Sequence, residues 1–366
     1  MTSTITPSEA PVTAASSVHE HAVRRYRQAN WWTRVRLHPA GPVAIMFLGL
    51  LAACIVAGLL VPQQFAFLNP ANLSLILKQI PNYGMVALGV GLLMIAGEFD
   101  LSVGSVFVVA PFAMATAYAA GIPLPVAILI GFSIAALIGL ANGLITLNFG
   151  IPSFITTLGM LFIVRTSAPF IVGYARSLPF KPPEAFTEIL TGDVNDVIAL
   201  FAEVEQLPLG LGRIPMQFIW FIGFALLCYL ILNRHFLGNH FFAAGGNPNA
   251  ARFAGINVYR TKVFGFILSS VFAAAAGLFS ITRLQTAMTN PQLFIELFAV
   301  AICVIGGLSL FGGRGSVIGI VLAAALLQLV QDVIILARLP GFYLDMFVGI
   351  MIVVGVVINQ VVRRKY

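Results

Sequence analysis

Charged residues are scarce in this chain, and their scarcity sets the class of protein before any motif is considered. Aspartate, glutamate, lysine and arginine make up only 9% of the 366 residues, whereas hydrophobic residues make up 59%. Soluble domains are about one quarter charged. The composition therefore excludes an ordinary soluble enzyme or binding module and indicates an integral membrane protein.

Cysteine is rare as well, and the motifs of common enzyme classes are missing. Cys54, Cys228 and Cys303 lie far apart, each inside an apolar run, so their spacing excludes a disulfide framework and a cysteine metal site. The chain has no Gly-x-x-x-x-Gly-Lys-Ser/Thr phosphate loop, no His-Glu-x-x-His and no Gly-x-Ser-x-Gly. These absences argue against an intramembrane enzyme. We expect this chain to bind no metal ion and no cofactor, and any ATP to be handled by another chain.

Basic residues outnumber acidic ones, 20 against 13, which gives a net charge of +7. They flank apolar runs, which indicates membrane topology rather than a surface for nucleic acid. Residues 1–40 are first rich in Ser, Thr, Ala and Pro and then basic, without the pattern of a cleaved signal peptide. We expect a cytoplasmic N-terminal tail with an interfacial helix anchored by Trp31 and Trp32.

Long apolar segments are what the chain has in abundance. A helix needs roughly 20 apolar residues to cross a hydrocarbon core about 30 Å thick. Hydropathy therefore predicts an all-α polytopic membrane domain over residues 41–366, with about ten transmembrane helices. The predicted spans are 41–61, 72–96, 104–120, 123–147, 152–173, 216–232, 262–281, 294–311, 316–336 and 341–361.

The distribution of charge predicts the side on which each long connection lies. Residues 174–215 hold six acidic and three basic residues, whereas residues 233–262 hold four basic residues and no acidic one. Basic connections are retained in the cytoplasm, so the first loop is expected outside and the second inside, with both chain termini cytoplasmic. A short helix is also expected near Glu184–Leu190 in the outer loop.

The segment 243–258 combines a tight turn with a short helix of small residues. Gly245 and Gly246 precede Asn247, which can cap a helix whose first position is Pro248. Gly255 suits the end of that helix. A helix of this size buries little surface by itself, so we expect it to fit a groove on another protein. The alternative is a solvated loop that only obeys the positive-inside rule.

Two junctions between predicted spans, 97–105 and 306–316, are rich in glycine. Pro81 is expected to interrupt the span before the first junction, and the short flank that remains would draw a polar turn below the membrane surface. Glu98 and Asp100 would then have to be paired or line a cavity. The alternative is that Asp100 and Ser102 only cap the next helix.

Polar residues within the spans complete the set of candidates. Asn142 and Thr157 are of types that more often form hydrogen bonds between helices than bind ligands. Arg165 and Glu296 are costlier inside a membrane and are more suggestive of function. The candidates for the translocation path or for gating are Glu98, Asp100, Ser102, Asn142, Thr157 and Glu296.

Four segments carry a resemblance to a known family: GEFDLSVGS at 97–105, PSFITTLGML at 152–161, AAGGNPNAARFAGINV at 243–258 and IGGLSLFGGRGSVIG at 305–319. From about residue 41 to its end, the chain resembles the permease subunits of ribose-type ATP-binding-cassette (ABC) importers, the monosaccharide branch. The tail before residue 41 is not covered by the resemblance.

The resemblance implies a bacterial inner-membrane protein that works in a complex. It implies a homodimer or heterodimer of permeases, two cytoplasmic subunits that bind ATP and Mg²⁺, and an extracytoplasmic solute-binding protein. It also implies that residues 243–258, within the cytoplasmic loop 233–262, form the segment that couples to the ATPase. The coupling residues are then Gly245, Gly246, Asn247, Pro248, Ala251, Arg252 and Gly255.

The chain departs from the family pattern in places that bear on its substrate. Glu98 and Phe99 stand before Asp100, where the family has glycine and one apolar residue. Asn239 replaces a basic residue, and Phe298 replaces an aspartate. A sugar, a sugar alcohol or a nucleoside-like solute therefore stays open. The competing hypothesis is an ion-coupled secondary transporter that uses Glu98 and Asp100 as ligands for protons or sodium.

Overall fold

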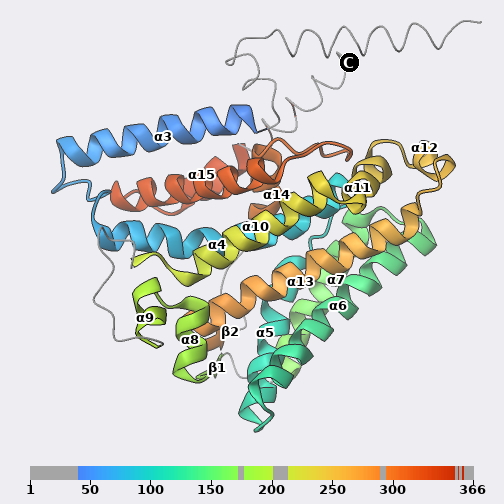
Figure 1. The fold of residues 1–366 in the computed structure, drawn as a ribbon, viewed down its shortest axis with the longest axis horizontal. Helices are drawn as coiled ribbons and strands as arrows, with labels where there is room; N and C mark the ends of the chain where they lie inside the picture. Colours follow the sequence, from blue (N-terminus) through green and yellow to red (C-terminus); the bar gives the residue numbers. More distant parts are fainter. Residues whose placement is uncertain are drawn as a thin grey trace, which may run out of the picture.

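A computed structural model describes residues 40–171, 177–200, 213–288 and 294–350, together with residues 353 and 357. The expected interfacial helix of the N-terminal tail lies outside the described residues. The described part is mainly helical (Figure 1). Its long helices pack side by side, and the connections between them gather at the two ends of the bundle.

A helix overlaps each of the ten ranges expected to cross the membrane. These helices are α3 (Gly41–Leu60), α4 (Pro70–Ile95), α5 (Val103–Ala119), α6 (Leu124–Phe149), α7 (Ser153–Ile171), α10 (Met216–Arg234), α13 (Val258–Leu284), α14 (Ile295–Ile305), α15 (Val317–Leu336) and a helix over 342–350.

Five of the described helices are long and apolar enough to cross a membrane, namely α3, α6, α10, α13 and α15. Helices α5, α7 and α14 are apolar but shorter over their described residues. Helix α4 has 26 residues but carries Lys78, Gln79 and Asn82 near its middle. The helical, multi-span class is confirmed, whereas the count of ten spans and the location of the termini stay predictions.

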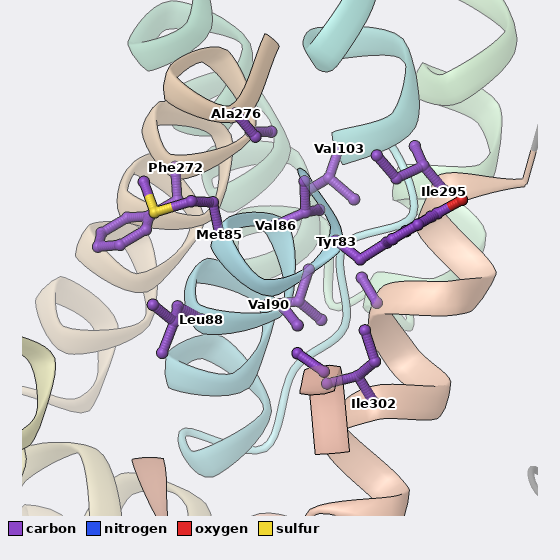
Figure 2. Close-up of a cluster of buried hydrophobic side chains, with 14 of the residues drawn as sticks. Tyr83, Met85, Val86, Leu88, Val90, Val103, Phe272, Ala276, Ile295 and Ile302 are labelled. Carbon is purple, nitrogen blue, oxygen red and sulfur yellow. The ribbon is translucent and has the colours of Figure 1, made fainter. Parts of the chain in front are cut away.

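Helix α4 is the centre of the bundle, because every residue from Ile80 to Ile95 is buried. Figure 1 shows α3 and α15 on one side of it and α13, α6 and α7 on the other. Figure 2 shows the packing, in which Met85 of α4 lies near Phe272 of α13. The ring of Tyr83 lies 5.2 Å from the ring of Phe298 on α14.

The expected interruption of this span at Pro81 was wrong, since α4 continues through it. A proline lacks the N–H that an interior helical position normally donates. Membrane helices tolerate this loss where neighbouring helices supply other partners. The carbonyl that Pro81 leaves without its helical donor is that of Leu77, and Pro81 itself is buried among the neighbouring helices. Packing on all sides therefore outweighs the local preference to break.

Helices α6 and α13 approach closely through small residues on α6. Gly131, Ala135, Gly139 and Gly143 recur every four residues and are all buried. Gly139 and Gly143 face α13, whereas Gly131 faces α5. A methyl group added at Gly139 would lie 2.5 Å from the Phe266 carbonyl oxygen on α13. The absence of side chains on this face therefore sets the distance between the two helices.

The connections predicted to be outside gather at one end of the bundle. There, β1 (Ser177–Pro179) pairs antiparallel with β2 (Thr286–Met288). Helix α8 (Glu184–Thr191) confirms the expected short helix, and the Ile189 carbonyl accepts a hydrogen bond from Trp220. Helix α9 (Val194–Ala199) follows.

The connections predicted to be cytoplasmic gather at the opposite end. Tyr259, for example, donates to Asn148 across 2.9 Å. This grouping is what an alternating series of spans requires, although it does not say which end faces the cytoplasm.

Candidate coupling and gating site

The expected turn and short helix at 243–258 are confirmed. Helix α12 (Pro248–Phe253) begins with Pro248 in its first turn, and the Asn247 side chain accepts a hydrogen bond of 3.0 Å from the Ala250 N–H. Gly255 has a φ of +81°, which is the left-handed conformation that glycine adopts freely after a helix. Before α12 lies α11 (Phe236–Gly246), which the sequence analysis did not predict.

Helix α12 exposes Arg252 and Phe253, and Phe253 is 93% exposed. Ala251 is instead buried against Ala244 and Val258 of the same chain. The side chain of Ala251 faces inward in this structure, and its role in coupling to a partner stays a prediction. The outward surface of α12 therefore has the guanidinium of Arg252 and the phenyl ring of Phe253. Phe253 was not among the predicted coupling residues, because a single Phe in an apolar sequence does not indicate whether it is exposed.

Glycines from three distant segments meet beside the end of α11. They form what we call the glycine contact, made of Gly97, Gly245, Gly246, Gly312 and Gly313. A methyl group added at Gly312 would lie 2.7 Å from Gly97 Cα and 2.9 Å from Gly245 Cα. The Gly313 N–H donates to the Ile95 carbonyl at the end of α4 across 2.8 Å. Side chains would separate these backbones, so glycine is required for the contact.

The chain turns back into the bundle after α4, through residues 96–102, which we call the re-entrant segment. It starts at the glycine contact, and α5 begins just after it. A methyl group added at Gly104, in the first turn of α5, would touch Glu296 and lie 3.4 Å from Ile295 at the start of α14. Figure 2 shows Val103 and Ile295 in this region.

The depth of the re-entrant segment follows from its neighbours. The first turns of α14 are level with Tyr83, because Phe298 stacks near that ring. Tyr83 stands twelve residues before the end of α4, which is about 18 Å at 1.5 Å per residue. The start of α5 is therefore deep in the bundle. The polar turn is buried because neighbouring helices pack around it, and not because α4 is interrupted at Pro81.

Asp100 lies on the re-entrant segment and is fully buried. Its Oδ1 accepts hydrogen bonds from the Ser102 N–H at 2.9 Å and from the Ser102 hydroxyl at 2.6 Å. The Asn142 amide of α6 donates to the same hydroxyl across 2.8 Å. Ser102 makes no side-chain cap to α5. Its hydroxyl links Asp100 to α6, so the two residues do more than cap a helix.

Two hydroxyl groups at the start of α7 hold the backbone of the re-entrant segment. The Phe99 N–H donates to Ser153 Oγ at 3.0 Å, and the Leu101 N–H donates to Thr157 Oγ1 at 3.1 Å. Thr157 in turn donates to the Ser153 carbonyl at 2.8 Å. Thr157 therefore belongs to the same site as Asp100. Ser153 belongs to the site as well. It was not a predicted site residue, and the sequence pointed to it only through the resemblance of the segment 152–161.

Glu98 is paired with Lys262, the fifth residue of α13. The Nζ–Oε1 distance is 2.6 Å, and the two side chains are only 12% and 13% exposed. Lys262 was not among the candidate site residues, because nothing in the sequence links it to a residue 164 positions away.

Glu296 lies beyond the other end of the re-entrant segment. It is buried and pairs with Arg165 of α7 at 3.0 Å. Its other oxygen, Oε2, lies close to where a side chain at Gly104 would stand. Glu98, Asp100 and Ser102 therefore lie on the re-entrant segment, and Asn142 and Thr157 contact it directly. Glu296 lies beside the first turn of α5.

Several buried polar atoms at this site have no hydrogen-bond partner among the described residues. They are Asp100 Oδ2, Asn142 Oδ1, Thr146 Oγ1, Ser269 Oγ and Glu296 Oε2. In the part of the chain that the structure describes, no group of three or more His, Cys, Asp or Glu side chains is placed to hold a metal ion. The chemistry of the site is therefore that of hydrogen bonds and ion pairs between helices.

Comparison with known proteins identifies the family to which the chain belongs. Residues 72–356 match the family described as the branched-chain amino acid transport system / permease component. The chain belongs to this permease family. It is a multi-pass protein of the bacterial inner membrane, and its family is that of the membrane subunits of ABC importers.

Curated relatives match the permease over most of its length. It is 30% identical over 365 residues to the probable ABC transporter permease protein y4mJ of Sinorhizobium fredii, which covers 100% of this chain and 99% of the relative. It is 30% identical to the galactose/methyl galactoside import permease protein MglC of Haemophilus influenzae, over 85% of this chain and 93% of the relative. Identity to the ribose import permease protein RbsC of Bacillus subtilis is 28%, over 86% and 91%. No solved structure matches the permease.

Proposed function

We propose that this permease is the membrane-spanning subunit of an importer for a monosaccharide or a similar small polyol, driven by ATP hydrolysis in partner subunits. The observation that carries the proposal is the direct contact between the exposed α11–α12 segment and the buried re-entrant segment. A solvated loop has no need of such a contact, whereas a segment that receives force from a motor does. Relatives named as import permeases for galactose and ribose support the same conclusion.

The proposed complex has two permeases, two cytoplasmic subunits that bind ATP and Mg²⁺, and an extracytoplasmic binding protein that delivers the solute. The surface of α12 with Arg252 and Phe253 contacts an ATPase subunit. When ATP closes the ATPase pair, α12 and α11 move together. The glycine contact passes this movement to the re-entrant segment, and through it to α5, α6 and α7.

The network around Asp100 acts as a gate in this mechanism. Asp100, Ser102, Asn142 and Thr157 are all fully buried, so in this conformation they close the space between α5, α6 and α7 instead of lining an open path. Movement of the re-entrant segment would break the hydrogen bonds that Thr157 and Asn142 make to it. Thr157 and Asn142 would then form hydrogen bonds with water or with the solute, and the space between α5, α6 and α7 would open as a translocation path.

The chemistry of the interior favours an uncharged solute over an amino acid. A zwitterion needs a cation and an anion free to pair with it, because an unpaired buried charge is costly. Lys262 and Arg165, the cationic side chains of this site among the described residues, instead already have anionic partners. Three of the five unpartnered atoms at the site belong to amide and hydroxyl groups, which are suited to the hydroxyls of a sugar.

An ion-coupled secondary transporter fits the structure less well. Such a transporter would need Glu98 free to bind a proton or a sodium ion, and Glu98 is held by Lys262 at 2.6 Å. Transport in reconstituted vesicles that is driven by an ion gradient, without any ATPase subunit, would support this competitor.

The test of the proposal is retention of the ATPase subunit by purified permease in a detergent pull-down. Burial of a phenyl ring contributes about 1.5–3 kcal/mol, so Phe253→Ala should weaken binding roughly 10- to 150-fold. Arg252→Glu should weaken it more at low salt than at high salt, because salt screens exposed charges.

Phe149→Ala is the matched control, since Phe149 is 76% exposed at the end of α6, outside the coupling segment. Its binding should equal that of the wild type. Full retention of the ATPase by Phe253→Ala combined with Arg252→Glu would contradict the proposed contact.

A further inference from the structure

The coupling segment and the start of α13, which follows it directly, touch the re-entrant segment at two places, and the two contacts differ in kind. The first is the glycine contact, where backbones meet without side chains. The second is the ion pair between Glu98 and Lys262. Gly245 is the next-to-last residue of α11 and Lys262 lies in the second turn of α13, so the two contacts bracket α12 along the chain.

Backbones in van der Waals contact resist being pushed together but resist separation only weakly, because dispersion attraction between individual atoms is small and falls steeply with distance. The glycine contact can therefore transmit a push from α11 to the re-entrant segment. It transmits a pull poorly, because Gly97, Gly245 and Gly312 have no side chains that could form a hydrogen bond or an ion pair across the contact.

The Glu98–Lys262 pair supplies the resistance to separation that the glycines lack. Its Nζ–Oε1 distance of 2.6 Å is that of a charge-assisted hydrogen bond. Both side chains are nearly nine-tenths buried, so water screens the attraction less than at an exposed pair. Pulling the two apart would leave two charges without partners in a poorly hydrated place.

The pairing is also specific. Residues 233–262 contain no acidic side chain, so Lys262 can find an anion only on another segment. Of the acidic groups near this end of the bundle, Asp100 is already bonded to Ser102. Glu98 is therefore the carboxylate that Lys262 contacts at this end of the bundle.

We propose that Glu98 and Lys262 are positioning residues for transport, which pull the re-entrant segment back with the coupling segment when the ATPase pair opens. The inference rests on the proposed function. Without the pair, ATP-driven closure would still push the gate in one direction through the glycine contact. The return stroke would be lost, so ATP would be hydrolysed without completing transport.

The test uses the complete complex of permease, ATPase and binding protein in proteoliposomes. It compares wild type with Glu98→Gln and Lys262→Gln, and measures ATP hydrolysis and solute import in the same vesicles. Galactose and ribose are the probes. We expect both variants to retain the ATPase and to hydrolyse ATP at near the wild-type rate, while import falls at least tenfold. The ratio of ATP hydrolysed to solute imported should rise accordingly.

The charge exchange, Glu98→Lys with Lys262→Glu, should restore the ratio to within about threefold of wild type, because the pair is re-formed in reverse. The matched control is Lys78→Gln, which removes one partner of the Lys78–Asp193 pair near the opposite end of the bundle. Its ratio should be that of the wild type.

Two results would overturn the inference. One is an unchanged ratio in Glu98→Gln and Lys262→Gln. The other is a parallel fall of hydrolysis and import together with a lower melting temperature, which would show a structural role only. Failure of the proposed function itself would be visible separately, because the wild-type permease would then neither retain the ATPase nor import solute with ATP.

Discussion

At the scale of single residues, Asp100 shows how a buried carboxylate is tolerated in a membrane domain. One oxygen accepts two hydrogen bonds from Ser102, and Ser102 is itself held by Asn142 of α6. Hydrogen bonds of this kind offset part of the cost of burial. The second oxygen has no hydrogen-bond partner among the described residues, so the network is stable in one conformation yet able to accept a new partner in another.

Replacement of Asp100 by Asn separates its charge from its shape. The amide oxygen can still accept from Ser102, so the permease should insert and assemble normally. The gate loses its charged acceptor, and we expect initial uptake to fall at least about tenfold, equivalent to roughly 1.4 kcal/mol of activation free energy. The measurement is uptake normalised to the amount of permease in the membrane.

Asp332→Asn is the control for this experiment, because Asp332 is also buried and accepts a hydrogen bond of 3.1 Å from Asn72. It lies on α15, away from the re-entrant segment, and its variant should keep most of its uptake. If Asp100→Asn lowered protein level and uptake in the same proportion, Asp100 would have a structural role only.

At the scale of elements, the face of α6 that packs on α13 controls how far apart the two helices stand. Gly139 is the tightest point that involves α13 backbone, with the Phe266 carbonyl and the Ile267 Cα both in the way of a side chain. Interiors are packed densely enough that one added methyl group there is not absorbed without movement.

Gly139→Ala should therefore destabilise the permease by about 1–3 kcal/mol, the usual cost of overpacking. A lower melting temperature in detergent is the expected result. Gly223→Ala on α10 is the control, since nothing lies within 4 Å of its added methyl group. Equal melting temperatures for Gly139→Ala and wild type would show that α6 and α13 can separate freely.

Helices and turns whose limits depend on residues close together in the sequence could be predicted. The apolar segments, the Asn247 cap, the Pro248 start and the Gly255 end are all read within a few residues. Helix α11 was missed because Gly238, Asn239 and the terminal glycines disfavour a helix. It forms nonetheless around Phe241, which is fully buried.

The parts that depend on distant partners could not be predicted. Pro81 looked like a break because its effect on an isolated helix is large, whereas the surrounding helices decide the outcome. Glu98 and Asp100 were recognised as costly inside the membrane, but their partners lie on α13 and α6. A single sequence does not state which distant side chain supplies a hydrogen bond.

At the scale of the whole molecule, the two ends of the bundle differ in composition. One end has the acidic residues of α8 and α9, and the other has the basic coupling segment. The positive-inside rule then assigns the second end to the cytoplasm. This orientation is the basis of the proposed mechanism, because the ATPase must meet α12 on the cytoplasmic side.

Single cysteines at Ala199 and Asn249 test the orientation, since both positions are exposed whereas the native cysteines are buried. An impermeant thiol reagent should label Ala199→Cys in intact spheroplasts. It should label Asn249→Cys only after the membrane is permeabilised. Labelling of Asn249→Cys from outside would reverse the orientation.

The burial of α4 from Ile80 to Ile95 has a consequence for biosynthesis. A segment leaves the translocon for lipid when lipid solvates it well, and α4 is not among the five helices with strong hydropathy. Its inner half is solvated by other helices instead, and α13, which covers much of it, is not made until Val258 has been translated. From the translation of Ile95 until that of Val258, the helix at the centre of the finished permease therefore lacks one of the helices that bury it.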